Sequence, residues 1–235
     1  MDPNLEPANF RRADELRWAS LRALDGDRTL CVCAVSALEV HGPHLPIGAD
    51  LHQAAWMADE TGRRFAAAHP EWTVLLHPPL PIGADELPLP GSIDSPPRVV
   101  YRAVVALGES LARAGFRTVM VTNAHGGPRH AAALEGLAGS IGWLRNAKNG
   151  YGRPAGTEPV SWSGWPAVAA ADLGRAYAEL SVRACLADLD AVVTGRVRAA
   201  EIRSIASDPP FLQPNFWRWL AAGGGAAAFA LRALL

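Results

Sequence analysis

Three side chains that can bind a metal ion lie close together in the sequence, between positions 39 and 50. Glu39 and His41 are two residues apart, so in extended chain they project to the same side. Asp50 follows a turn-forming stretch with two glycines and two prolines, just before an expected helix. Two carboxylates and an imidazole at the end of a strand suit zinc or manganese. As alternatives, Asp50 can cap the helix, and the nearby His44 can be an ordinary loop residue.

The elements that must position these side chains follow from the apolar pattern. An apolar run before Glu39 predicts a buried strand, and apolar residues at helical spacing predict several amphipathic helices. Strands that alternate with helices in this way form parallel sheets with right-handed crossovers, and ligands bind beyond the carboxyl ends of the strands. Glu39, His41 and His125 each follow an expected strand. The expected strands are 30–38, 72–77, 118–122, 159–162 and 191–193, and the expected helices are about 51–68, 98–114, 129–141 and 166–187.

Composition favours one enzyme-sized domain. With 235 residues, 49% hydrophobic content and a net charge of −1, the chain can bury one core over residues 1–235 and has no basic excess for nucleic acid. We expect residues 1–20 to be an N-terminal extension and 221–235 an Ala/Gly-rich C-terminal segment. We expect neither a signal peptide nor a membrane span. Three cysteines form no disulfide framework, and Cys31 and Cys33 are expected to pack in the core, so we predict a cytoplasmic location.

The stretch Glu39-Val40-His41-Gly42-Pro43-His44-Leu45-Pro46, followed by Asp50, resembles the first motif of the creatininase (creatinine amidohydrolase) family. That motif reads Glu-Gln-His-Gly-Pro-His-Leu-Pro and then Asp, so only Val40 departs from it. The resemblance implies a single-domain three-layer α/β/α sandwich with a mainly parallel sheet. It also implies that Glu39, His41 and Asp50 bind one or two divalent metal ions, Zn or Mn with Fe as a further option, and that Asp50 bridges them.

Two later stretches are similar to further motifs of this family. Within the proline-rich loop 78–97, Ser92 matches a residue on the substrate side, but Asp85-Glu86 stands where Glu-His is usual. We expect a catalytic role for Glu86, Asp85 or His44; the alternative for Glu86 is a solvated carboxylate. The stretch from Asn123 to Pro128 is similar to Asn-Gly-His-Gly-Gly-Asn, which implies that His125 is a metal ligand and that the substrate contacts Asn123, Gly126 and Gly127.

The helix expected at 166–187 departs from the family, which carries His-Ala-Gly, two variable residues and Glu-Thr-Ser. Glu179 matches the Glu and is implied as a ligand, but Gly174 occupies the position of the histidine that transfers protons. The alternative for Glu179 is an ion pair with Arg183 four residues later. Trp162 and Tyr177 complete the candidate substrate-binding residues.

The resemblance implies a hydrolase of non-peptide C–N bonds. We expect a metal-dependent amidohydrolase that acts on a small cyclic amide, a formamide or a related small molecule, and not on creatinine because the helix histidine is missing. A different ring opening is a further enzymatic option, and a catalytically degenerate binding or structural subunit is the non-enzymatic alternative. By family analogy we expect a homo-oligomer, and among the possible assemblies a hexamer.

Overall fold

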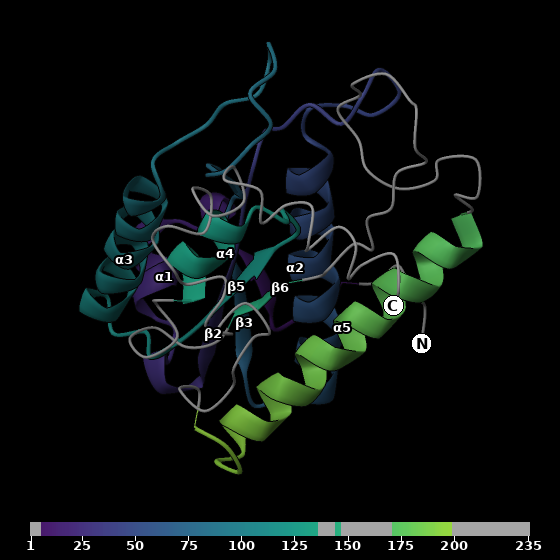
Figure 1. Ribbon diagram of the computed structural model, residues 1–235. Coiled ribbons are helices and arrows are strands. Elements are labelled where there is room, and N and C mark those ends of the chain that lie inside the picture. The colour runs from purple at the N-terminus through teal and green to yellow at the C-terminus, as the bar shows by residue number, and fades with distance from the viewer. Residues whose placement is uncertain (1–5, 136–143, 147–170, 199–235) are drawn as a thin grey trace.

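A parallel β-sheet lies between two layers of helices (Figure 1). The computed structural model describes residues 6–135, 144–146 and 171–198. Every strand pairing in this part of the chain is parallel. The strands are β1 (Phe10–Arg12), β2 (Thr29–Ser36), β3 (Thr73–Leu76), β4 (Leu80–Pro81), β5 (Thr118–Asn123) and β6 (Leu144–Asn146). The helices are α1 (Trp18–Arg22), α2 (Ala49–Ala68), α3 (Pro97–Arg113), α4 (Pro128–Glu135) and α5 (Ala171–Val193), with single 3-10 turns at Ala13–Glu15 and Gly26–Arg28.

Strand β2 is the centre of the sheet, whose order is β1-β3-β2-β5-β6 with β4 also paired to β2. All eight residues of β2 are buried, as the apolar run predicts for a strand covered on both faces. Its side chains alternate between the two faces. Leu30, Val32 and Ala34 pack in the core on the α2 side, whereas Cys33 and Val35 pack in the core on the side of α3 and α4. The predicted core role of the first-strand cysteines is confirmed by this burial.

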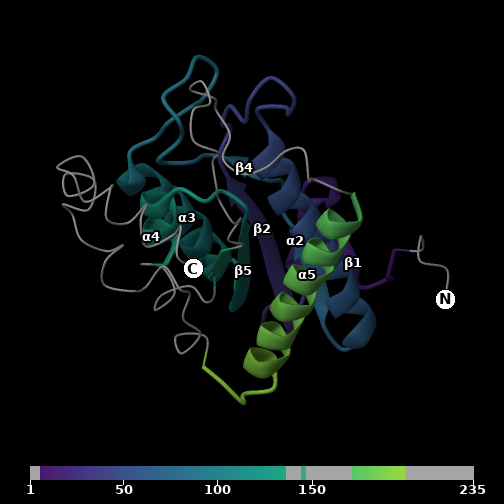
Figure 2. The ribbon, with the colours of Figure 1, turned by 45° about the vertical axis from the view of Figure 1, so that its right-hand side comes forward.

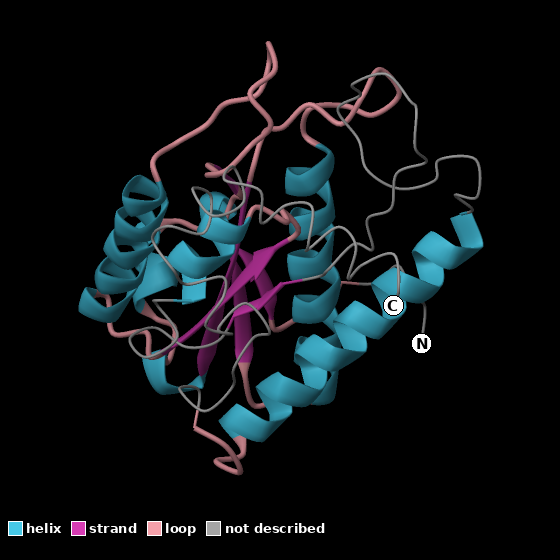
Figure 3. Ribbon diagram, in the orientation of Figure 1, coloured by secondary structure: helices cyan, strands magenta, loops and turns pink. Residues whose placement is uncertain are grey.

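The strands form one layer between the helices in Figure 3, with α1, α3 and α4 on one side and α2 and α5 on the other. Figure 2 shows α5 running alongside α2. Cys185 and Leu189 of α5 pack in the same core as Phe65 of α2. The predicted α/β fold with a mainly parallel sheet is therefore confirmed.

One predicted strand is wrong. Residues 191–193 are the last turn of α5, because Cys185, Leu189 and Val193 recur at helical spacing and pack in or against the α2-side core. The β-branched pair at the end of that run suggested a strand, but burial of a helical stripe decides the structure.

The remaining boundaries agree within a few residues. Strand β1 lies in the segment expected to be an N-terminal extension, and it pairs with β3. Helix α5 is described from Ala171 and ends later than expected, at Val193. Helix α4 is described only to Glu135, and the expected strand at 159–162 and the segment 221–235 lie outside the described residues. Within the described part of the chain, no helix is long and apolar enough to cross a membrane.

Candidate metal centre

Four predicted ligand residues converge at the carboxyl edge of the sheet. Glu39 and His41 follow β2, His125 follows β5, and Asp50 lies in the first turn of α2. Asp50 does not cap α2, since the N-cap is Gly48 and no side chain caps it. Parallel strands end at the same edge, so residues far apart in the sequence meet there.

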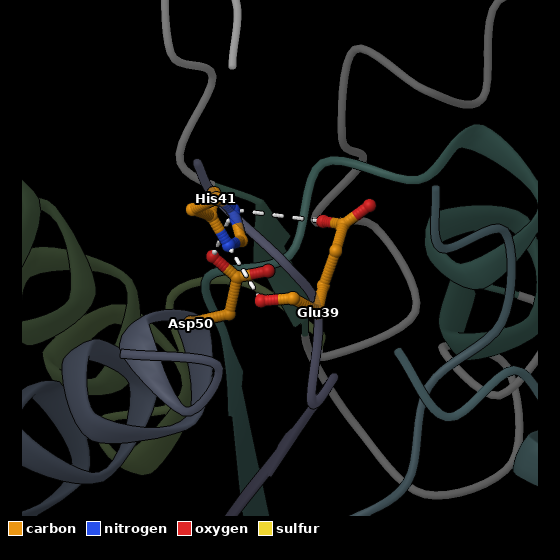
Figure 4. Close-up of side chains that lie close together, drawn as sticks. All are labelled: Glu39, His41 and Asp50. Carbon is orange, nitrogen blue, oxygen red and sulfur yellow. Dashed lines mark hydrogen bonds and ion pairs between the residues drawn. The ribbon is translucent and has the colours of Figure 1, made fainter. Parts of the chain in front are cut away.

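Asp50 is shared by both imidazoles. His41 Nε2 lies 3.3 Å from Asp50 Oδ1 and 3.5 Å from Glu39 Oε2, and Figure 4 shows these three side chains pointing toward one another. His125 Nδ1 lies 3.0 Å from Asp50 Oδ2 and 3.3 Å from Glu39 Oε2. One nitrogen of each ring therefore faces both carboxylates.

The second nitrogen of each ring faces a backbone carbonyl. His41 Nδ1 lies 2.9 Å from the oxygen of Glu39, and His125 Nε2 lies 3.1 Å from the oxygen of Ala84. A carbonyl only accepts, so these two nitrogens carry the protons and donate. This fixes the ring orientations and aims the opposite nitrogens at the carboxylates, which is the arrangement typical of metal-binding histidines.

Charge balance holds the cluster together. The hydrogen bond that His41 donates to Asp50 raises the pKa of His41 to about 9, although burial opposes the charge. Burial also opposes the charge on His125, but hydrogen bonds to Asp50 and Glu39 outweigh it and raise the pKa to about 10. Burial acts to raise the pKa of Asp50, yet its bonds to His125 and His41 lower it on balance. Two protonated imidazoles thus neutralise two carboxylates at neutral pH.

The donor set fits a divalent metal ion. Among the described residues, Glu39, His41 and Asp50 offer ligand atoms that all lie within 4.8 Å of one another. His125 adds a second imidazole nitrogen beside the same two carboxylates. Mixed nitrogen and oxygen ligands suit zinc and manganese, and either ion could replace the protons that now balance the charge.

The loop between β4 and α3 supports this centre through its backbone. The Leu87 N–H donates to Glu39 Oε1 at 2.6 Å, and the Ala84 carbonyl accepts from His125. Ser92, predicted to bind substrate, instead accepts a hydrogen bond from the Val40 N–H at 3.1 Å through its hydroxyl. Its observed contact therefore joins this loop to the loop that carries Glu39.

The two acidic residues of this loop have different environments. Asp85 accepts from the side chain of Arg129 at 2.6 Å and from its N–H at 3.1 Å, so its carboxylate is already paired at the start of α4. Glu86 is buried, and no donor from another described residue reaches its carboxylate oxygens. Burial, followed by the neighbouring Asp94 carboxylate, raises the pKa of Glu86 to about 8. Glu86 is therefore buried and protonated at neutral pH, which removes the solvated alternative.

The residues at the end of β5 and just after it position His125. Asn123 is fully buried; its side chain accepts from Ser36 and from the His125 N–H and donates to the His125 carbonyl. These contacts hold the turn that carries His125, and the substrate contact of Asn123 stays a prediction. Gly126 is exposed. Gly127 is buried, and a Cβ there would lie 2.4 Å from His125 Nε2, so only glycine fits this close approach.

Glu179 is not brought to the metal centre. Its carboxylate accepts from both terminal nitrogens of Arg64 at 2.8 and 2.9 Å and from Arg183 at 2.7 Å. Arg64 is 14 residues along α2 from Asp50, which is about 21 Å at 1.5 Å per residue. The alternative ion pair with Arg183 is thus present, and the predicted ligand role is not supported.

The other predicted residues lie apart from the cluster or outside the description. His44 is exposed on the loop after Glu39 and is not a member of the carboxylate–imidazole cluster. Tyr177 lies on α5, and Trp162 lies outside the described residues. Sequence reasoning missed Asp94 and the backbone contacts of Ala84 and Leu87. No pattern marks a residue whose contribution is a peptide group.

A parallel α/β sheet with this cluster at its carboxyl edge defines the class: an α/β protein with a candidate divalent-metal centre. The chain belongs to the creatininase family, because residues 14–165 match the family described as creatinine amidohydrolase. The mycofactocin precursor peptide peptidase of Mycolicibacterium smegmatis (strain ATCC 700084 / mc(2)155) is 32% identical over 148 residues, which cover 62% of this chain and 56% of that protein. The chain thus spans about half the length of this curated relative.

Solved structures agree on the fold. A protein described as a creatinine amidohydrolase from Bacteroides fragilis NCTC 9343 superposes with a TM-score of 0.60 at 17% identity, covering 77% of this chain and 96% of that one. A single-substitution mutant of creatininase gives a TM-score of 0.57 at 15% identity, covering 78% and 98%. At these identities the likeness shows the fold alone.

Proposed function

We propose that the protein is a metal-dependent amidohydrolase that hydrolyses a C–N bond of a small cyclic amide, a formamide or a related small molecule. The observation that carries the proposal is the orientation of His41 and His125: each donates to a backbone carbonyl and aims its other nitrogen at Glu39 and Asp50. We propose zinc or manganese, with Asp50 bridging when two ions are bound. A divalent ion there would polarise the substrate carbonyl and activate water.

Glu86 supplies the proton in this proposal. Hydrolysis adds water to the carbonyl carbon and breaks the C–N bond, so the leaving nitrogen must gain a proton. Glu86 is protonated at neutral pH and belongs to the loop segment whose neighbours, Ala84 and Leu87, contact His125 and Glu39. A positioned general acid typically contributes about 10²–10⁴-fold to the rate. Asp85 is a poorer candidate because Arg129 holds its carboxylate.

Two alternatives are distinguished by the same experiment. The curated relative is a peptide peptidase, which favours a peptide bond as a second candidate. The resemblance places Gly174 where the family has its helix histidine, which is the ground for a catalytically degenerate binding subunit.

The experiment measures metal content first and turnover second. Purified protein is loaded with Zn²⁺ or Mn²⁺, dialysed, analysed for bound metal, and assayed with lactams, formamides, creatinine and short peptides. We expect retained metal, activity on a small amide, little on creatinine, and a 10²–10⁴-fold lower rate for Glu86→Gln with unchanged metal. The matched control is Glu109→Gln, an exposed carboxylate on α3. Absence of bound metal would refute the proposal, activity only on peptides would favour the peptidase, and a metal-loaded but inactive protein would favour the binding subunit.

A further inference from the structure

His130 is a fully buried histidine that the proposed reaction does not use. It lies on α4, and none of its surface is exposed. Its ring packs edge-on against that of His125, with 5.2 Å between centroids and 80° between planes. Burying a polar ring here has a cost unless it forms hydrogen bonds, so its contacts indicate what it does.

Ala84 links the two histidines through both of its backbone groups. The Ala84 N–H donates to His130 Nδ1 at 3.3 Å, and the Ala84 carbonyl accepts from His125 Nε2 at 3.1 Å. Ala84 thus donates a backbone hydrogen bond to His130 and accepts one from His125, so it connects the two rings. Gly127 leaves the space for this arrangement, since a Cβ there would lie 2.7 Å from the Ala84 oxygen.

The hydrogen bond from the Ala84 N–H indicates the tautomer of His130. An N–H can only donate, so the Nδ1 that it contacts is the ring nitrogen without a proton and acts as the acceptor.

We propose that His130 is a positioning residue for the metal centre: by anchoring the Ala84 N–H, it holds the Ala84 carbonyl that orients His125 toward the metal. This inference rests on the proposed metal-binding role of His125. It assigns to His130 an effect on how tightly the metal binds. It does not place His130 in contact with metal or substrate.

Two substitutions separate the acceptor from the volume of the ring. Asn carries an oxygen on Cγ, where His carries Nδ1, so His130→Asn keeps an acceptor for the Ala84 N–H. His130→Leu fills the site without an acceptor. Partners that orient metal-binding histidines typically contribute 10–100-fold to metal affinity. We therefore expect His130→Leu to weaken metal binding by roughly tenfold or more and His130→Asn to retain most of the wild-type affinity.

The test is a chelator competition with Zn²⁺ and with Mn²⁺ on the full chain, together with the absorption spectrum of the Co²⁺-loaded protein. His77→Leu is the control, because the His77 Nε2 is buried with no hydrogen-bond partner among the described residues, but His77 lies after β3 and is not part of the metal centre. Of these variants, we expect only His130→Leu to change both the metal affinity and the Co²⁺ spectrum. If His130→Leu does not fold, His130→Met replaces it, since the unbranched methionine side chain adapts to irregular space.

Equal metal affinity for wild type and His130→Leu would overturn the inference while leaving the proposed function intact. An equal loss in the Leu and Asn variants would also overturn it, because the ring volume and not the acceptor would then matter. A wild-type protein that binds no metal would instead remove the proposed function, and the inference with it.

Discussion

Asp50 lies closer than Glu39 to each of the two imidazoles of the metal centre, so we expect the arrangement to depend most on Asp50. Its two oxygens serve different rings, Oδ1 toward His41 and Oδ2 toward His125. Its position in the first turn of α2 fixes it between the loops that follow β2 and β5. A shared carboxylate of this kind is suited to bridge two ions or to serve one.

Asp50→Asn should abolish metal retention and lower the thermal stability. The amide keeps the size of the side chain but lacks the charge that both rings face, and leaving a buried charged hydrogen-bond partner unmatched costs on the order of 2 kcal/mol. Metal analysis after dialysis and thermal melts with and without Zn²⁺ check this. The wild type should gain stability with metal by mass action and the variant should not. Asp59→Asn, on the same helix but paired with Arg12 and Arg63, is the control. A variant that kept its metal would contradict the central role of Asp50.

Glu86 should make the protein less stable as the pH rises. Its pKa is about 8 in the folded protein and about 4.5 when exposed, so between these values the folded state binds more protons than the unfolded state. Stability therefore falls as the pH rises from about 5 to about 8, as the linkage relation requires. Glu86→Gln, which stays neutral, should match the wild type near pH 5 and exceed it at pH 8. Urea unfolding of the metal-free protein at both pH values measures the difference. Parallel pH dependence of the two proteins would show that the Glu86 pKa is not raised.

At the scale of helices and strands, these residues are brought together where backbone segments pack closely. The start of α4 lies close enough to the loop after β4 that Gly127 has no room for a side chain beside Ala84 and His125. The positions of α4 and of His125 are therefore coupled.

Gly127→Ala should weaken metal binding and destabilise the fold by about 1–3 kcal/mol, the usual cost of overpacking. Its Cβ would lie 2.4 Å from His125 Nε2 and 2.7 Å from the Ala84 oxygen. These two atoms form the hydrogen bond that orients the ring. Gly126→Ala is the control, because Gly126 is exposed and does not have a positive φ. Chelator competition and urea unfolding report the two effects. Equal results for both variants would mean that the backbone adjusts to the methyl group at no cost.

Glu179→Gln should leave metal binding unchanged. Its carboxylate pairs with Arg64 and Arg183 where α5 crosses α2, and these arginines hold its pKa low, at about 2. The partly exposed ion pair contributes little to stability. The test compares the metal bound by Glu179→Gln with the metal bound by Asp50→Asn. Loss of metal from the Glu179 variant would instead indicate that Glu179 is a ligand.

The sequence predicts those parts of the fold and the centre that depend on local pattern. The run in β2 and the stripe of α2 follow from burial on known faces, and Glu39, His41 and Asp50 come from one continuous stretch. Glu179 could not be placed in this way, because its partner Arg64 is 115 residues away and depends on how α5 crosses α2. The buried hydrogen bond between Asn123 and Ser36 could not be predicted for a similar reason, because Ser36 belongs to a different strand. Side-chain direction across elements is set by packing, and a single sequence does not record it.

At the scale of the whole molecule, several apolar side chains near the metal centre are exposed on the surface. Large exposed apolar residues of the described part include several on the loops after β2 and β4: Leu45, Ile47, Leu87, Leu89 and Ile93. The chain also ends in an apolar stretch at 226–235, outside the described residues. Grouped apolar side chains on a surface are typical of contacts with another molecule.

We predict on this basis that the protein is a homo-oligomer in solution, with a hexamer expected from family analogy. Light scattering on the full chain at micromolar concentration should give a mass several times that of the 24.9 kDa chain. Removing residues 226–235 should lower that mass if the apolar terminus contributes to assembly. Leu180→Ser is the control, because Leu180 is a large exposed apolar side chain on α5 and does not belong to those two loops. It should leave the mass unchanged. A wild-type mass near that of one chain would contradict the prediction, and the metal centre would then have to be complete within a single copy.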